Sequence, residues 1–245
     1  MTDNQPSDNV AIHDQTTLGD LIVQHPELAS TLEALNLDYC CGGQQTLTTA
    51  CSVAGIDLAT TLETLNATPL VAEPAEWASL DMAALADHVE TVHHAYLHDA
   101  LPRLGDLAEK VAGVHGENHP ELIHVQQTYA ALRADLEPHL MKEERVLFPM
   151  IRELAAATSA PSFHCGTLAN PISAMAFEHE QAGELLAKLR QLTDNYTAPS
   201  DACGSYRALY SGLAELETDT HQHIHKENHV LFPNAMRQEQ AMSQG

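Results

Sequence analysis

Apolar residues recur at intervals of three and four along most of this chain, and four long stretches keep that spacing. They cover residues 80–112, 120–155, 171–193 and 203–240, and clusters of Gly, Pro, Ser or Asn separate them. This spacing places apolar side chains on one face of an α-helix. Four long helices can bury these faces against one another, so the pattern predicts an all-α protein with an up-down four-helix bundle.

Shorter helical patterns precede the bundle. They predict helices over 18–22, 28–37 and 57–66, and another that begins near Thr46. The second of these helices runs into a Cys-Cys-Gly-Gly sequence at 40–43. We expect this glycine pair to end the helix and to permit a positive φ.

A linker separates the short helices from the long ones. Residues 67–78 contain two prolines among small residues, a composition typical of linkers. We therefore expect a small helical domain over 1–72, with about 1–16 flexible, and the bundle over 73–245.

Prolines also occur within the long helical patterns. Pro102 and Pro138 each remove a backbone hydrogen bond, so we expect bent helices there. The break at 155–170 contains Pro, Cys and Gly and is expected to be a surface loop.

An eleven-residue block that begins at His139 occurs again from His223. Seven positions are identical, including the His, a Glu four residues later and a closing Val-Leu-Phe-Pro. Residues four apart share a helix face, so His139 can meet Glu143, and His223 can meet Glu227. We expect the closing apolar residues to plug the end of the bundle and the proline to stop or kink the helix.

Helical phase indicates which histidines face the bundle interior. From His139, the residues Leu132, Leu136, Val146 and Leu147 lie at −7, −3, +7 and +8, offsets that share one helix face. His139 is therefore expected to point inward. Apolar residues at −7, +7 and +8 predict the same for His223.

The other two long helices supply one inward histidine each. His179 is the only histidine of its helix and has leucines at +7 and +10. In the first long helix His94 repeats this spacing, which favours it as the fourth inward histidine. His98 lies one turn further along much of the same face and is the alternative.

Four histidines and two glutamates in one core are a donor set for two metal ions. The carboxylates can bridge the ions, and a mixture of imidazole and carboxylate suits iron or manganese better than a thiolate-rich structural zinc site. Six protein ligands for two ions leave open coordination positions, and metal binding offsets the cost of burying ionised groups. A duplicated structural repeat without metal is the competing interpretation.

Residues beside the proposed ligands have two interpretations. Asp135 and Glu178 are candidates for a supporting role, in which they guide cations or protons, although an ordinary solvated or hydrogen-bonded role is commoner for such residues. Glu144 and Asn228 are expected to face outward or to support the ligands.

The overall charge restricts the class of partner. The chain has 34 acidic and 11 basic residues, a formal net charge of −23, which disfavours binding to nucleic acid or anionic membranes and favours cations. No apolar run predicts a membrane span, and the polar amino terminus predicts no secretion. We expect a soluble cytoplasmic protein.

Five cysteines, at 40, 41, 51, 165 and 203, show no paired framework. Reduced thiols are therefore expected. Cys40 and Cys41 are either incidental thiols at a helix end or a site for redox chemistry or soft-metal transfer.

At these motifs the chain closely resembles the repair-of-iron-centres family, the di-iron iron–sulfur cluster repair proteins with a hemerythrin-like bundle. The resemblance rests on Leu-Asp-Tyr-Cys-Cys-Gly-Gly at 37–43, on both copies of the duplicated block, and on the sequences around His94 and His179. Together these motifs are highly specific and cover nearly the whole chain.

The resemblance implies a centre of two non-haem iron ions bridged by an oxo group, Glu143 and Glu227. It implies four histidines as terminal ligands, namely His94, His139, His179 and His223. It also links Cys40 and Cys41 to iron transfer. Extra histidines at 221, 225 and 229 depart from the family pattern and leave additional metal binding open.

The resemblance further implies repair of iron–sulfur clusters damaged by nitric oxide or oxidants, by donation of iron to damaged or apo iron–sulfur proteins. One alternative is reduction of nitric oxide at the di-iron centre. Another is a sensor that reversibly binds oxygen or nitric oxide. A homodimer also stays open.

Overall fold

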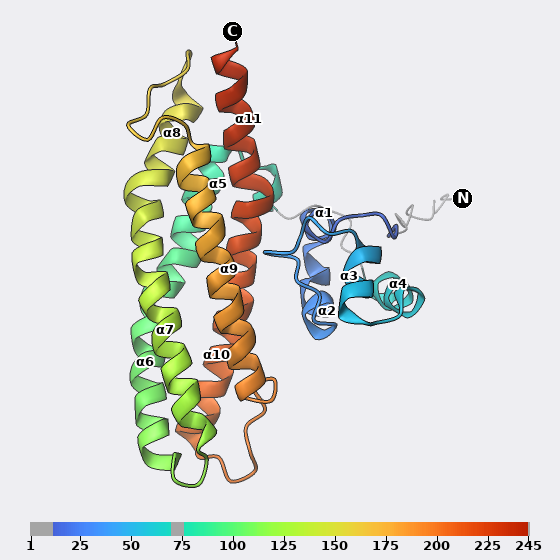
Figure 1. The fold of residues 1–245 in the computed structure, drawn as a ribbon, viewed down its shortest axis with the longest axis vertical. Helices are drawn as coiled ribbons and strands as arrows, with labels where there is room; N and C mark the ends of the chain where they lie inside the picture. The colour runs from blue at the N-terminus through green and yellow to red at the C-terminus, as the bar shows by residue number, and fades with distance from the viewer. Residues whose placement is uncertain (1–11, 70–75, 245) are drawn as a thin grey trace, which may run out of the picture. The chain divides into compact units, whose positions relative to one another are not determined.

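The computed structural model describes residues 12–69 and 76–244, and its described residues are helices joined by turns and loops (Figure 1). The chain divides into two compact units, Met1–Ala78 and Ser79–Gly245. The expected domain boundary between 72 and 73 lies outside the described residues. The same is true of 1–11, most of the segment expected to be flexible.

The first unit is a small set of short helices. Side-chain oxygens of Thr17, Thr46 and Asp57 accept a first-turn backbone N–H at the start of α1, α3 and α4, which satisfies a donor without an intrahelical partner. Ahead of them, the N–H of Ile12 donates to Oδ1 of Asn66 at 3.3 Å. The helices are α1 (Leu18–Gln24), α2 (Ala29–Ala34), α3 (Leu47–Ala54) and α4 (Leu58–Ala67), with a 3₁₀ turn at Pro26–Leu28.

The second short helix ends earlier than expected, and not at the glycine pair. α2 stops at Ala34, and Asn36 takes the left-handed conformation with φ 54°. Gly42 has no positive φ, so that expectation was wrong. A Cβ on Gly42 would instead lie 3.0 Å from the carbonyl oxygen of Asp38 and 3.2 Å from its carboxylate. Gly42 therefore allows the close approach of Asp38.

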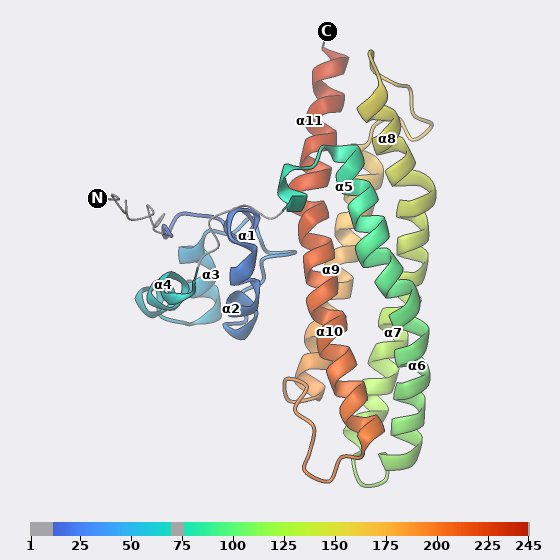
Figure 2. The ribbon, with the colours of Figure 1, turned by 180° about the vertical axis from the view of Figure 1, so that it is seen from behind.

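The second unit is the up-down four-helix bundle, which confirms the predicted fold class (Figure 1). α7 packs against α6 and α9, and α10 packs against the same two helices, so the four long helices form a closed ring. Figure 2 shows α6 beside α10 from behind. The long helices are α5 (Met82–Val89) with α6 (Ala95–His115), α7 (Glu121–Lys142) with α8 (Phe148–Ala156), α9 (Ala169–Leu192), and α10 (Gly204–Lys226) with α11 (Phe232–Ser243).

The core of the bundle is filled by the apolar residues at helical spacing. Burying such a side chain fully stabilises the fold by about 1.5–3 kcal/mol. Buried leucines come from all four long helices, among them Leu101, Leu104, Leu132, Leu186 and Leu213.

Three of the long helices contain a π-helical turn, at Glu90–His94, Glu143–Leu147 and Glu227–Leu231. The helices continue beyond these turns, so the proline of each duplicated block does not stop its helix. Pro149 and Pro233 instead take the second position of α8 and α11, directly after the π turn. Proline has no N–H to donate to the preceding turn, and it lies where the helix changes from π to α hydrogen bonding.

Among the described helices, none is long and apolar enough to cross a membrane. The segment between α8 and α9 is a loop, as expected, and its Phe163 and Leu168 are buried.

Candidate metal centre

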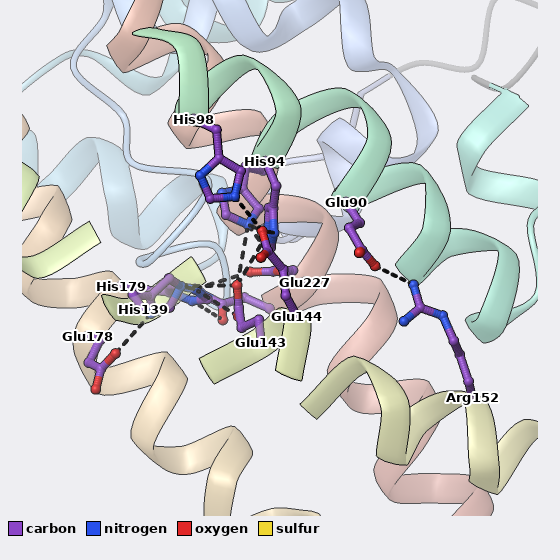
Figure 3. A network of polar contacts seen from close by, with 12 residues as sticks. Glu90, His94, His98, His139, Glu143, Glu144, Arg152, Glu178, His179 and Glu227 are labelled. Carbon is purple, nitrogen blue, oxygen red and sulfur yellow. Dashed lines mark hydrogen bonds and ion pairs between the residues drawn. The ribbon is translucent and has the colours of Figure 1, made fainter. Parts of the chain in front are cut away.

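Six ionisable side chains converge inside the bundle (Figure 3). Each long helix contributes a histidine, and two of the long helices also contribute a glutamate. Every one of these side chains is at most 2% exposed, whereas the side chain of His98 is 53% exposed. The structure therefore brings together the six residues predicted as ligands, which are His94, His139, Glu143, His179, His223 and Glu227.

The donor atoms form two groups that share both carboxylates. In each group all donor atoms lie within 4.8 Å of one another. One group adds His94 and His223 to the glutamates and is called the His94/His223 position here. The other adds His139 and His179 and is called the His139/His179 position.

Distances between donor atoms match two neighbouring metal positions. Nε2 of His94 lies 3.2 Å from Nε2 of His223, and the same atoms of His139 and His179 are 3.1 Å apart. Two ligands of one ion, each bound at about 2.1 Å and at right angles, are about 3.0 Å apart. The two imidazole pairs therefore have the separation expected of ligands to a common ion.

Each glutamate reaches both positions. Oε2 of Glu143 lies 3.4 Å from Nε2 of His94 and 3.3 Å from Nε2 of His139. Glu227 places one oxygen 3.1 Å from Nε2 of His223 and the other 3.1 Å from Nε2 of His179. Both carboxylates are therefore arranged to bridge.

Within the part of the chain that the structure describes, no hydrogen bond of regular geometry reaches the four buried oxygens of Glu143 and Glu227, which lie in ion-pair range of the histidines. Buried carboxylates without hydrogen-bond donors are costly. A cation between the imidazole nitrogens and these oxygens would satisfy them all. The donor set therefore fits a metal centre.

The pKa values of the buried histidines and glutamates depend strongly on one another. Burial alone would lower the pKa of His139, but the carboxylate of Glu143 outweighs it and raises the pKa to about 8. Burial also opposes the charge on His223, whose pKa is raised to about 10 by Glu227 and Glu143. Although burial favours protonated Glu143, His139 and neighbouring histidines hold its pKa well below its usual value. Imidazolium groups thus balance the carboxylates in the metal-free chain.

The π turns and the phenylalanines that follow them shape this site. Glu143 and Glu227 begin their π turns. After the turns, the ring of Phe148 packs against His94 at 5.3 Å between centroids, and Phe232 stacks on His179 at 6.0 Å. The closing residues of each duplicated block therefore hold a histidine of another helix.

Outer hydrogen bonds orient two of the histidines through residues next to the two shared glutamates. Nδ1 of His94 lies 3.1 Å from Oε1 of Glu144, and Nδ1 of His179 lies 3.0 Å from Oδ1 of Asn228. Such partners fix the ring and raise its basicity as a ligand. The duplicated block is the sequence signal for Glu144 and Asn228, because each directly follows the Glu that both copies contain.

The two residues predicted to support the ligands have different positions. Oε2 of Glu178 lies 3.0 Å from Nδ1 of His139, and its other oxygen pairs with Lys142. Asp135 is exposed on α7 and does not join the group. Lys142 and His139 together lower the pKa of Glu178 against the opposing effect of burial, so Glu178 accepts as a carboxylate.

Cys40 and Cys41 lie in the first unit and form no disulfide. Their sulfur atoms are 3.7 Å apart. Oδ1 of Asp38 accepts the N–H groups of Cys40 and Cys41 at 3.0 and 2.9 Å. The thiols and this carboxylate form a further group of potential metal donors among the described residues.

Comparison with known proteins gives two domain matches. Residues 85–235 match the hemerythrin HHE cation binding domain, and residues 14–68 match ScdA_N, a domain of unknown function. The first match contains all six buried donors.

Similar proteins extend over nearly the whole chain. The iron–sulfur cluster repair protein YtfE of Musicola paradisiaca is 38% identical over 92% of this chain and 98% of its own length. YtfE of Cronobacter sakazakii is 36% identical over 93% and 98%. A probable iron–sulfur cluster repair protein of Haemophilus influenzae is 36% identical over 91% and 98%. The chain therefore belongs to the family of iron–sulfur cluster repair proteins with a hemerythrin HHE cation binding domain.

Proposed function

We propose that this protein repairs iron–sulfur clusters damaged by nitric oxide or oxidants, and that it does so by donating iron from a centre of two non-haem ions. The acceptors in this proposal are damaged or apo iron–sulfur proteins in the cytoplasm. The oxo bridge implied by the family resemblance is part of the same proposal. When bound, the iron supplies both the cargo and a redox-active centre.

The observation that carries the proposal is the pair of donor groups that share Glu143 and Glu227. Imidazole and carboxylate donors without thiolate suit iron. The names of the relatives add the acceptor class, since they are iron–sulfur cluster repair proteins.

We include Cys40 and Cys41 as residues that assist the hand-over of iron. Support comes from the two sulfur atoms and the Asp38 carboxylate, which lie close enough to one another to share an ion. If these residues assist, Cys40→Ser with Cys41→Ser slows transfer to an acceptor and leaves the iron content of the bundle unchanged.

Metal content and transfer test the proposal together. Protein purified without oxygen from iron-replete cells should hold about two irons per chain, and mixing it with an apo iron–sulfur protein should rebuild the acceptor's cluster when sulfide is supplied. His139→Ala and Glu227→Ala should lose iron and transfer. His124→Ala is the matched control, because His124 is an exposed histidine of α7.

Different results separate the other functions. Zinc or no metal in the unaltered protein would contradict the di-iron centre. Two irons that stay bound while nitric oxide is consumed with an electron donor would favour nitric oxide reduction. Reversible spectral changes with oxygen or nitric oxide, without iron loss or product, would favour a sensor.

A further inference from the structure

Support for the four buried histidines is uneven. Three of them hydrogen-bond an oxygen through Nδ1, the nitrogen that faces away from the metal positions. His223 is the exception: its Nδ1 is buried and has no hydrogen-bond partner among residues 12–69 and 76–244. An acceptor at this nitrogen fixes the ring and strengthens it as a ligand. His223 is therefore the least supported of the four ligands.

The duplicated pattern shows which position would supply a hydrogen-bond acceptor for Nδ1 of His223. In both halves, the residue after the bridging glutamate holds the histidine of another helix, through Glu144 in one half and Asn228 in the other. The residue that directly precedes this histidine in sequence differs between the halves. It is Glu178 before His179, and His93 before His94.

Glu178 hydrogen-bonds His139. His93, at the corresponding position of the other half, stacks on His223 instead. The rings of His93 and His223 are nearly parallel, at 12°, with centroids 5.7 Å apart. A stacked ring presents its face and offers no acceptor atom to Nδ1 of its neighbour.

The nitrogens of His93 have other partners. Nδ1 of His93 lies 2.8 Å from Oδ1 of Asp219, and Nε2 lies 2.6 Å from Nζ of Lys226. These two interactions engage both ring nitrogens and hold His93 in the stacked orientation. His93 is therefore kept from turning an edge toward His223.

We propose that the two metal positions are unequal, and that the ion at the His94/His223 position is the one that the protein releases first. This proposal rests on the proposed function, because it assumes two bound irons. At the His139/His179 position both histidines have an oxygen partner. At the His94/His223 position only His94 has one, and its partner Glu144 is shared with Nε2 of His98 at 2.7 Å. Loss of one such partner lowers metal affinity by about 10- to 100-fold.

Iron release from the full chain tests this inequality. The chain is loaded with ferrous iron without oxygen and mixed with an excess of a ferrous chelator, and the absorbance of the iron complex is followed. We expect two phases of about one iron each, with the first about tenfold or more faster than the second.

Two variants assign the phases to positions and serve as controls for each other. Asn228→Ala removes the partner of His179 and should accelerate only the slow phase, by about tenfold or more. Glu144→Ala removes the partner of His94 and should accelerate only the fast phase. Asn228→Asp keeps an acceptor oxygen and should not accelerate the slow phase, which distinguishes the lost hydrogen bond from a general loosening of the fold.

The failures of the two proposals are distinguishable. Two irons that leave in a single phase, or an Asn228→Ala variant that accelerates the fast phase, would overturn the inequality and leave the di-iron proposal standing. A chain that binds zinc or no metal under iron-replete conditions would overturn both.

Discussion

In the metal-free chain, two of the buried histidines hold protons at neutral pH, because they lie against carboxylates that carry no other counter-charge. The pKa of His139 is raised to about 8 and that of His223 to about 10. A histidine must be neutral at the nitrogen that binds a metal. Metal binding at this site therefore competes with protons.

Proton release should accompany metal loading. At pH 7, binding of ferrous iron without oxygen should release up to about two imidazole protons per chain, since His139 and His223 both lose one. Release should fall to about one as pH rises through 8, and toward zero above 10, while the apparent affinity rises. Calorimetric titration in buffers of different ionisation enthalpy measures the number. Release that does not change between pH 7 and pH 10 would contradict this assignment of protons.

The six predicted ligands could be found from sequence because the offsets that select them run along regular α-helix. His139, His179 and His223 lie within α-helices. His94 ends a π turn just before α6, and the two glutamates begin π turns just after α7 and α10.

The outer partners of these ligands were less accessible. Asp135 is four residues before His139, yet it is exposed. The partner of His94 is Glu144, fifty residues away on another helix. Which helix face meets which neighbour depends on packing, which the periodicity of one helix does not contain.

At the scale of elements, the π turns explain where periodicity failed. Val146 shares the face of His139 by an α-helical count, but its side chain is 38% exposed, whereas Leu147 is 1% exposed. A π turn holds more residues than an α turn and shifts the phase of those that follow. The four long helices were predicted because their apolar pattern extends over many turns on both sides of each shift.

Close contact between α6 and α10 should make alanine destabilising at one glycine. A Cβ on Gly212 would lie 2.5 Å from Cδ2 of the buried Leu104, while a Cβ on Gly113 meets nothing within 4 Å. Gly212→Ala should therefore lower the free energy of unfolding by about 1–3 kcal/mol. Gly113→Ala, the control, should raise it by up to about 1 kcal/mol through helix propensity. Urea unfolding at fixed metal load measures both, and a Gly212→Ala variant as stable as Gly113→Ala would refute the close contact.

The start of α9 depends on a side chain from α11. The N-cap residue Leu168 offers no capping side chain, and its N–H donates to the carboxylate of Glu239 at 3.0 Å. The hydroxyl of Thr167 donates to the same carboxylate at 2.6 Å. Glu239→Ala should lower the free energy of unfolding by about 1–2 kcal/mol.

Two controls isolate this cap. Glu239→Gln keeps an acceptor oxygen and should lose less stability than Glu239→Ala. Glu153→Ala removes an exposed carboxylate of α8 and should change the unfolding free energy by no more than about 0.5 kcal/mol. Equal losses for all three variants in thermal or urea unfolding would show that Glu239 acts through net charge and not as a cap.

At the scale of the whole molecule, the two units carry different chemistry. All six buried imidazole and carboxylate donors belong to Ser79–Gly245, while Cys40 and Cys41 belong to Met1–Ala78. The apolar core of the bundle is likewise built from residues 97–216. In the proposed function, storage of metal and its hand-over would therefore belong to separate parts of one acidic chain, whose net charge of −23 favours cations throughout.

A chain that consists of residues 79–245 alone should fold and bind as much iron as the full protein, because it contains every donor of the centre and the core around it. It should rebuild the cluster of an apo acceptor more slowly, since it lacks the two adjacent thiols. Elemental analysis and circular dichroism test the first expectation, and acceptor reconstitution tests the second. The same fragment with Glu227→Ala is the control for non-specific iron. Less iron in the fragment than in the full chain would mean that the first unit contributes ligands. Transfer at an unchanged rate would remove the thiols from the hand-over.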